Sequence, residues 1–368
     1  MANKKLMLSV LIISFKVLCI FTTSFMVGFW IHKYNMNEDI SLVEYKKLKA
    51  EANIVYPELT ICFPYPFLNE EFYKFGNGLN KVNYLEYLRG DIASNETFQK
   101  VRYDEVTFDL FDHLDSINVA ARSDQTLTNY NCTNRQNCNI LQFKNNYNGF
   151  DPMLYGFYKC FGIEINKHHL GDILAINISF KKSLMKIMKE VDSAFVMFNH
   201  PGQLRLKLRA GKPIWKNFEE NVIPEFFEIE PYEILKRRNK VHKPCYDGSI
   251  SYDDRLLKRQ LELVSCRTPY QESYQDYAIC DVKMKDSVFR MNEKIDDVLI
   301  PCDEISLLTY DYISYGFGNV TWNATFGYFP LFIMYPDRVK EIKNSVAIDE
   351  HTLIGNIGGY IGLFLGAC

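Results

Sequence analysis

A long apolar run near the N-terminus is the strongest hydrophobic pattern in the chain. Residues 6–31 read LMLSVLIISFKVLCIFTTSFMVGFWI and carry one charge, Lys16. About 20 apolar residues are enough to cross the hydrocarbon core of a bilayer, and this run shows no polar face. A cleaved signal peptide is the alternative, but its apolar region is about 7–15 residues long and ends in small residues. Because the run ends in Phe29, Trp30 and Ile31, which is typical of an interfacial anchor, it predicts an uncleaved transmembrane helix.

A second uncharged run covers 352–368 and reads TLIGNIGGYIGLFLGAC. Its 17 residues fall slightly short of a full span, so we interpret them as the start of a second transmembrane helix. Each glycine weakens a helix in water by about 1 kcal/mol relative to alanine, whereas small residues four apart let helices approach closely in lipid. Glycine carbonyls can also coordinate a cation in a pore, with a simple helix-dimer anchor as the alternative. The run holds three overlapping G-x-x-x-G pairs: Gly355 with Gly359, Gly358 with Gly362, and Gly362 with Gly366.

The middle of the chain, residues 32–351, has the hydrophobic spacing of strands, with one clear helical stretch. Short apolar runs that end at proline, glycine or cysteine lie at 54–62, 194–198 and 328–335. From Tyr252 to Val264 the apolar residues recur every three or four positions, which predicts a helix. Aromatic residues make up 15% of the chain and suit a β-rich domain. These patterns predict an α+β domain between the two membrane segments.

Cysteines and glycosylation sequons place this middle domain outside the cell. No C-x-x-C spacing of the zinc-binding type occurs among the cysteines of the middle domain, so a disulfide framework is favoured over reduced, buried thiols in a cytosolic domain. Lys4 and Lys5 in the short segment 1–5 favour a cytoplasmic N-terminus. The eight cysteines of the middle domain are Cys62, Cys132, Cys138, Cys160, Cys245, Cys266, Cys280 and Cys302. The five N-x-[ST] sequons are at Asn95, Asn131, Asn177, Asn319 and Asn323.

Charge and motifs argue against several other classes of protein. The net charge of −3 and the lack of a basic stripe interleaved with aromatics exclude a nucleic-acid partner. The chain contains no H-E-x-x-H, G-x-S-x-G or phosphate-cradling glycine loop, so we predict neither an enzyme nor a bound metal or cofactor. The pair His168 and His169 is interpreted as part of a solvated loop, and 236–238 (Lys-Arg-Arg) as a solvated basic turn rather than a protease site.

Three segments of the chain stand out together. The first is 56–67, YPELTICFPYPF, which follows the first apolar run. The second is 158–166, YKCFGIEIN, and the third is 353–368, LIGNIGGYIGLFLGAC. These segments resemble the family of epithelial sodium channels, degenerins and acid-sensing ion channels: 158–166 is the looser match, and 353–368 is the most specific, similar to the family signature at the start of the second membrane helix. Much of the sequence between these segments has no counterpart in the resemblance.

The resemblance implies a subunit of a homo- or heterotrimer with related subunits in the plasma membrane. Such a channel conducts Na⁺, is blocked by amiloride and is gated through its extracellular domain. It also implies a hand-shaped domain of palm, finger, thumb, knuckle and β-ball between the two helices, with the thumb at about 235–306. Na⁺ is then the permeant ion, and no cofactor is implied. The sequence would stop before the body of the second helix.

The resemblance further assigns roles to individual residues. Gly366, Ala367 and Cys368 would form the selectivity filter, Gly362 the amiloride-blocking position and Gly355 the degenerin gating position. Two departures weaken these roles, because Cys368 stands where serine is usual and Asn356 where aspartate is usual. A non-conducting membrane-anchored receptor or adhesion glycoprotein is the rival, which explains the cysteines and sequons equally well but the glycines poorly. The implied disulfides are Cys62–Cys160, Cys132–Cys138, Cys245–Cys302 and Cys266–Cys280.

Overall fold

The chain divides into two compact units, each of which is described by itself. The first, here called the helix-bearing unit, comprises the residues up to Glu44, Leu235–Arg238 and the residues from Glu341 on. The second, the sandwich unit, comprises Tyr45–Ile234 and Asn239–Lys340. The computed structural model describes residues 2–47, 55–76, 78–89, 91–92, 96–123, 126–132, 138–151, 156–166, 172–191, 193–201, 211–215, 225–240, 243–248, 250, 252–271, 274–280, 297–313 and 328–366.

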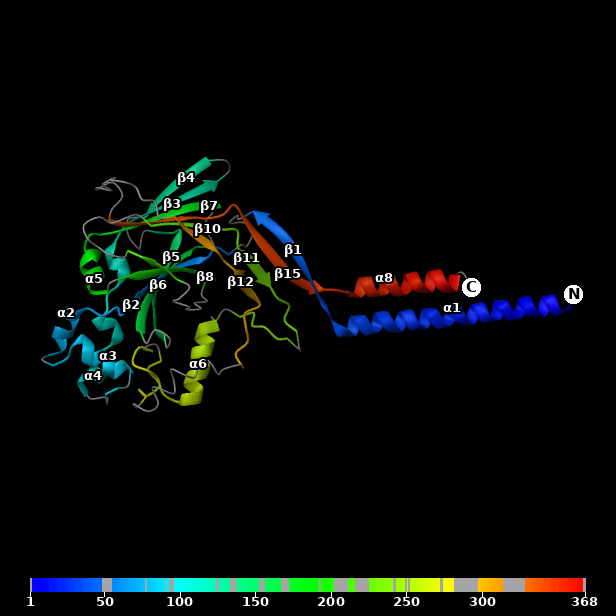
Figure 1. Ribbon diagram of the computed structural model, residues 1–368, viewed down its shortest axis with the longest axis horizontal. Helices are drawn as coiled ribbons and strands as arrows, with labels where there is room; N and C mark the ends of the chain where they lie inside the picture. Colours follow the sequence, from blue (N-terminus) through cyan, green and yellow to red (C-terminus); the bar gives the residue numbers. More distant parts are fainter. Residues whose placement is uncertain are drawn as a thin grey trace. The chain divides into compact units, whose positions relative to one another are not determined.

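Two helices and the strands that lead into them form the helix-bearing unit (Figure 1). Strand β1 pairs with β15, and the two belong to a four-stranded sheet with the order β1-β15-β11-β12. The chain therefore leaves the first helix and enters the second through neighbouring strands. The elements are α1 (Ala2–Met36), α8 (Glu350–Tyr360), the π-helical turn η7 (Ile361–Leu365) and parts of β1 (Asp39–Lys47), β11 (Glu233–Lys236) and β15 (Arg338–Val346). The fourth strand of the sheet, β12 (Asp303–Leu307), belongs to the sandwich unit.

Two β-sheets form the centre of the sandwich unit. The first has six strands in the order β13-β10-β14-β7-β3-β4, and all the pairings described in it are antiparallel except β10 with β14. Its strands are β3 (Leu114–Ser123), β4 (Thr126–Cys132), β7 (Asp172–Phe180), β10 (Glu225–Ile229), β13 (Tyr310–Ile313) and β14 (Tyr328–Met334). The second has the order β5-β6-β2-β8-β9, from β2 (Glu58–Pro64), β5 (Leu141–Asp151), β6 (Gly156–Ile165), β8 (Ala194–Asn199) and β9 (Lys212–Ile214).

One hydrophobic core joins the inner faces of these two sheets. Phe63 of β2 and Phe161 of β6 belong to the same buried cluster as Ile178 of β7 and Leu331 of β14. Alternate residues of each strand point into this cluster, as the twofold repeat of a strand requires. Trp215 is also buried there and lies edge-on to Phe180, with the ring centroids 5.5 Å apart.

A second, aromatic core holds a group of short helices next to the sandwich. Phe67, Tyr84 and Tyr103 are fully buried in it, and Phe157 of β6 and Tyr270 join the same cluster. Edge-to-face aromatic pairs add to the stabilisation that burial of their area gives. The helices are α2 (Asn69–Phe72), η2 (Tyr73–Phe75), α3 (Lys81–Arg89), α4 (Glu96–Lys100) and η3 (Tyr103–Val106). The turn η4 (Leu110–His113) and α5 (Leu184–Val191) pack against the first core instead, and α6 (Tyr252–Val264) lies elsewhere in the unit.

The mixed helix and sheet composition predicted from the sequence is confirmed. The predicted helix from Tyr252 to Val264 is α6, with the same bounds. The apolar runs at 54–62, 194–198 and 328–335 correspond to β2, β8 and β14, although β2 begins only after Pro57. Leu235–Arg238, the start of β1 and the residues from Glu341 on group with the helices. The extracellular domain at 32–351 and its thumb at about 235–306 stay predictions.

Two of the segments that carry the family resemblance lie side by side as β2 and β6. Their antiparallel register places Cys62 directly opposite Cys160. Gly162 lies in β6, and a β-carbon there would collide with the carboxylate of the buried Glu58. Any other residue at this position would force the Glu58 carboxylate to move.

Buried Lys159 is also part of the β6 segment. Its ammonium group lies 3.0 Å from Asp104 Oδ1 and donates to Thr107 Oγ1 at 2.8 Å. Asn148 donates to the same carboxylate oxygen of Asp104, at 3.2 Å. Since η3 carries Asp104, this ion pair ties the short helices to the sheet.

Candidate functional site

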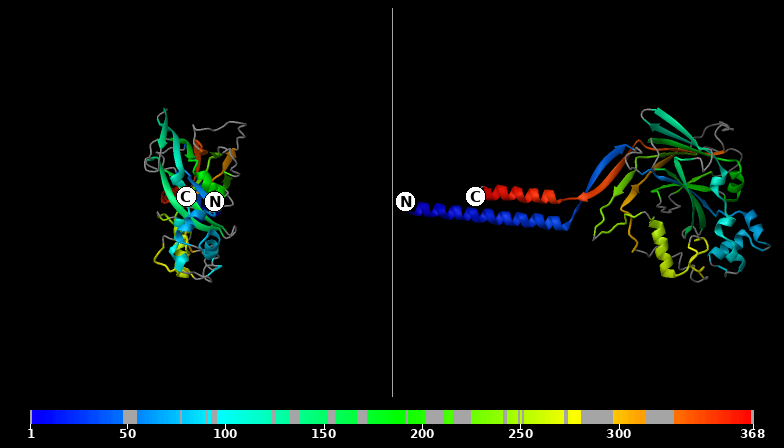
Figure 2. Two further views of the ribbon diagram at one scale, coloured as in Figure 1. Left: turned by 90° about the vertical axis from the view of Figure 1, so that its left-hand side faces the viewer. Right: turned by 180° about the vertical axis from the view of Figure 1, so that it is seen from behind.

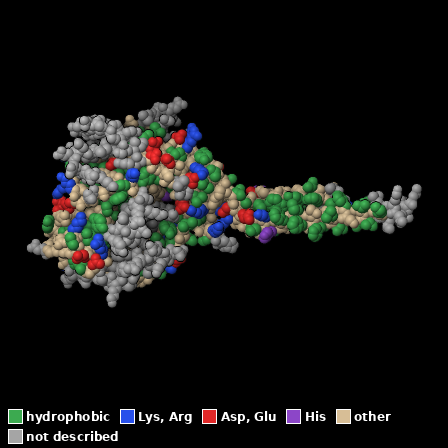
Figure 3. All heavy atoms as spheres, viewed as in Figure 1, with side chains coloured by type: hydrophobic (Ala, Val, Ile, Leu, Met, Phe, Trp, Pro, Cys, Tyr) green, Lys and Arg blue, Asp and Glu red, His purple; other side chains and the backbone are tan. Residues whose placement is uncertain are grey.

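Helix α1 is the element best suited to cross a membrane. Over Ser9–Met36 its apolar side chains are exposed, and it is the one helix among the described residues that is long and apolar enough for a span (Figure 3). The helix runs from Ala2 to Met36, and so extends beyond the predicted 6–31 at both ends. It ends where Asn37 adopts a left-handed backbone, with φ at 49°, a conformation that asparagine tolerates after a helix.

The second helix of this unit begins at a capped N-terminus. Asp349 accepts a hydrogen bond from the Thr352 amide at 2.7 Å, which satisfies a backbone donor of the first turn of α8. Hydrogen bonds from Thr352 lower the pKa of this carboxyl group below its usual value. α8 passes without a break into η7, and π-helical turns often occur at functional sites.

The two helices lie side by side in the helix-bearing unit (Figure 2). Of the described side chains of α1, only Cys19 and Thr23 are buried, one helical turn apart on the same face. Thr23 Oγ1 donates to the Cys19 carbonyl at 2.8 Å, so its hydroxyl is satisfied within the helix. Small side chains at such a place let two helices approach closely.

The glycines of the second helix are not required by packing within the chain. A β-carbon added at any of them would meet nothing within 4 Å outside its own helical backbone and chain neighbours. Glycine at these places nevertheless weakens the helix, by about 1 kcal/mol each relative to alanine. Contacts among the described residues therefore do not account for the pattern. The five positions are Gly355, Gly358, Gly359, Gly362 and Gly366.

The residues predicted for the pore fall at different places in this helix. Gly355 lies in α8, Gly362 in η7, and Gly366 directly follows η7. Ala367 and Cys368 lie outside the described residues, so the predicted filter is described only at its first position.

A basic side chain from the segment 236–238 holds the turn between α1 and β1. Arg238 Nη1 lies 2.9 Å from Asp39 Oδ1, and its Nη2 donates to Asn37 Oδ1 at 3.1 Å. Lys236 lies 2.8 Å from Glu341 of β15. The interpretation of 236–238 as a solvated basic turn is therefore wrong, because two of its cations anchor the strands of the helix-bearing unit.

Replacing Arg238 with glutamine is expected to loosen the turn after α1. Partly exposed ion pairs of this kind contribute about 1 kcal/mol, so amide exchange over 37–40 should become about fivefold faster. Hydrogen exchange with mass spectrometry on the full chain measures this. Arg338→Gln is the control, since Arg338 pairs only with exposed Asp337. Equal rates in both variants would contradict the anchoring role.

Four disulfides lie in the described residues. They join Cys62 to Cys160, Cys132 to Cys138, Cys245 to Cys302 and Cys266 to Cys280, which are the pairs that the family resemblance implies. Disulfides persist in oxidising surroundings, as outside the cell.

The predicted glycosylation residues differ in their surroundings. Asn131 is exposed in β4, at the edge of the six-stranded sheet. Asn177 is half-buried in β7, between β3 and β14, and its buried Oδ1 has no hydrogen-bond partner among the described residues. The other three, Asn95, Asn319 and Asn323, lie outside the described residues.

We expect a glycan at Asn131 and none at Asn177, because an edge strand leaves room for one and a central strand does not. The measurement is the change in electrophoretic mobility on enzymatic deglycosylation of protein from a secretory host. Asn131→Gln should remove the part of the mobility shift that one glycan causes, and Asn177→Gln should leave the shift unchanged. The reverse pattern would show that the position of a sequon in the sheet does not decide whether it is glycosylated.

Two further candidates from the sequence, His168 and His169, lie outside the described residues. Within the part of the chain that the structure describes, no group of three or more His, Cys, Asp and Glu side chains is arranged to hold a metal ion.

Comparison with known proteins leaves the family open. No family model matches the chain, and no curated protein matches it. Among solved structures, the chain is similar to a proton-activated chloride channel determined by cryo-EM, with 7% sequence identity over 99% of this chain and 94% of that one. The TM-score is 0.31, a likeness too low to carry an argument about fold or function.

Proposed function

We propose that this chain is a subunit of an oligomeric cation channel of the sodium channel, degenerin and acid-sensing type. One observation carries the proposal: glycines recur through α8 and η7 where no contact with the residues that the structure describes requires them. Helices that meet around an axis in lipid need small residues at the contact, and the exposed carbonyls of such residues can replace the water around a cation.

The exposed strand β1 supports assembly with further subunits. It lies at an edge of its sheet, and Ile40, Leu42, Val43 and Tyr45 are each at least 45% exposed. Because successive residues point to opposite sides, apolar side chains occupy both faces of the strand. Edge strands with exposed apolar residues invite association, so a partner subunit on this strand fits the proposed trimer.

The finer parts of the proposal follow the family resemblance. Residues 352–368 begin the second membrane helix, and Na⁺ passes a filter at Gly366, Ala367 and Cys368. Gly362 lines the site of amiloride block, and Gly355 is the gating position. The disulfides favour an extracellular sandwich unit, with the N-terminus in the cytoplasm and the chain in the plasma membrane.

The test is the effect of a bulky side chain at Gly362. In cells that express the full-length protein, we expect amiloride-sensitive Na⁺ current, and Gly362→Leu should reduce it at least tenfold with surface expression unchanged. Ile354→Leu is the control, since Ile354 is 68% exposed on α8 and leucine preserves its character. Chemical cross-linking of the wild type should yield trimers as the largest species.

The rival function is a membrane-anchored receptor or adhesion glycoprotein without a pore. It accounts for the disulfides and for α1, but not for the glycines. Surface expression without current, both alone and together with related subunits, would favour this rival. A cross-linking ladder that stops at the dimer would also count against the channel.

A further inference from the structure

One face of the six-stranded sheet in the sandwich unit is uncharged where β4, β3 and β7 lie side by side (Figure 1). Alternate residues of these strands fill the hydrophobic core, and the residues between them point to the opposite face. The register of the three strands places these outer residues in two rows that run across the sheet. The rows, here together called the amide face, are Asn131, Asn118 and Asn177, and Asn129, Ala120 and Ala175.

The asparagines of the amide face are unusual for a sheet, because this residue is depleted in strands. Asn118, Asn129 and Asn131 are exposed, and their side chains form no hydrogen bond or ion pair with the residues that the structure describes. A carboxamide both donates and accepts hydrogen bonds and carries no charge. Such groups beside the methyl groups of two alanines suit a neutral ligand that combines hydroxyl and acetamido groups with C–H surface, which is the chemistry of a glycan.

The chain itself can carry such a ligand, because Asn131 is the acceptor residue of a glycosylation sequon. It lies on β4, the edge strand of the sheet, and its side chain is exposed. In the transfer, its amide nitrogen bonds to the anomeric carbon of a lipid-linked oligosaccharide, loses one proton and displaces the lipid pyrophosphate. The first sugar then begins directly beside Asn118, the register partner of Asn131.

The spacing of the strands sets how far the glycan reaches across the sheet. Neighbouring strands lie about 4.8 Å apart, and one sugar residue spans about the same distance. The two acetamido sugars of the glycan core therefore cover β3 and β7, and the following mannose reaches β14. Met334 of β14 is 51% exposed there, and it continues the second row as the register partner of Ala175. An exposed apolar side chain at this place fits the C–H face of a sugar ring.

We infer that the N-linked glycan on Asn131 lies back over the amide face and stabilises the folded sandwich unit. Its first sugar forms hydrogen bonds with the carboxamide of Asn118, and the following sugars pack over Ala120 and Ala175 towards Met334. The inference goes beyond the proposed function and does not depend on it, because neither stability nor access to the sugar requires a current. It rests on glycosylation of Asn131, which is tested first.

The experiment uses the full chain in detergent, purified from a secretory host. Peptide N-glycosidase treatment of the denatured chain should convert Asn131 to aspartate, which mass spectrometry detects. Loss of the sequon in Thr133→Ala should raise the equilibrium constant for unfolding in urea about tenfold, as expected for one or two lost hydrogen bonds. Trp215 fluorescence follows the unfolding. Thr133→Ser keeps the sequon, and its glycosylated fraction should unfold like the wild type.

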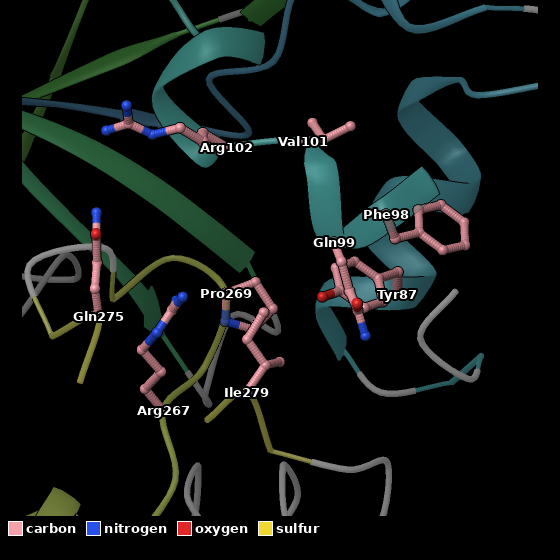
Figure 4. Close-up of a pocket in the computed structure, with 9 residues that line it drawn as sticks. All are labelled: Tyr87, Phe98, Gln99, Val101, Arg102, Arg267, Pro269, Gln275 and Ile279. Carbon is pink, nitrogen blue, oxygen red and sulfur yellow. The ribbon is translucent and has the colours of Figure 1, made fainter. Parts of the chain in front are cut away.

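Further variants connect this stabilisation to the amide face. Asn118→Ala should destabilise the glycosylated chain but not the Thr133→Ala chain, because the carboxamide acts through the sugar. An endoglycosidase should also cleave a high-mannose glycan from the native wild type more slowly than from Asn118→Ala. Gln275→Ala is the control for both measurements. It removes an exposed carboxamide from a pocket (Figure 4) whose described lining residues all lie outside the six-stranded sheet.

Three results would overturn the inference. The first is equal stability with and without the glycan, and the second is an equal effect of Asn118→Ala in both backgrounds. The third is an unmodified Asn131 in a chain that binds free N,N′-diacetylchitobiose, which would assign the amide face to a glycan of another molecule.

Discussion

Replacing Cys62 and Cys160 together with alanine is expected to lower the free energy of unfolding of the sandwich unit by about 5 kcal/mol. The bond closes a loop of 98 residues, and restricting the unfolded chain over such a length contributes about this much. Both cysteines are fully buried and directly opposite each other in β2 and β6. Small cavities left by the two sulfur atoms add to the loss.

A second disulfide provides the matched control. Cys132–Cys138 closes a loop of only 6 residues, so replacing both of its cysteines should lower stability by about 2 kcal/mol. Urea denaturation of the full chain, followed by the fluorescence of buried Trp215, measures both losses. Equal losses would mean that loop length does not explain the stabilisation by the β2–β6 bond.

Removing the carboxylate of Asp104 by an alanine substitution is expected to destabilise the sandwich unit by about 3 kcal/mol. The side chain of Lys159 is 3% exposed, so that its ammonium group would be left buried without its counter-ion. Lys159→Met should have a smaller effect, of about 1 kcal/mol. The side chain of Asp104 is 34% exposed and water can solvate it once the lysine is gone.

The same denaturation measurement tests this asymmetry. The double variant Asp104→Ala with Lys159→Met should recover most of the loss, because no unpaired charge then remains in the interior. Asp337→Ala is the control, since its side chain is 80% exposed and it pairs with the exposed Arg338. A Lys159→Met loss larger than that of Asp104→Ala would contradict this account.

Local patterns in the sequence were sufficient to predict several elements. The spacing of three and four in 252–264 predicts α6, and short apolar runs locate β8 and β14. The bounds of α1 were less well predicted. Its last residues, 32–35 before Met36, are polar and so lie outside the apolar run, but they still form a helix. The apolar run shows which residues suit the hydrocarbon core of a membrane, whereas the helix continues beyond these residues.

Contacts between distant segments could not be predicted from local patterns. Eight cysteines allow 105 pairings, so that the pairing came from the family resemblance and not from spacing. Arg238 and Asp39 are 199 residues apart, and nothing near either residue indicates the other.

The glycine pattern predicts one feature of the second helix and misses another. It predicts close association of membrane helices, and around Gly355 and Gly362 the described residues leave space for a neighbour. It did not predict the π-helical turn at Ile361–Leu365, because such a turn depends on local hydrogen bonding and not on hydrophobic spacing.

A change in the hydrogen bonding of that π-helical turn would rotate the end of the helix about its own axis. A π-helical turn holds one more residue than an α-helical turn, and each residue of an α-helix advances the chain by about 100° around its axis. If Ile361–Leu365 returns to α-helical hydrogen bonding, Gly366 rotates by about this angle relative to Gly355 while every residue stays helical. The part of the helix that carries the proposed filter can then present a different face to its neighbours without any unfolding.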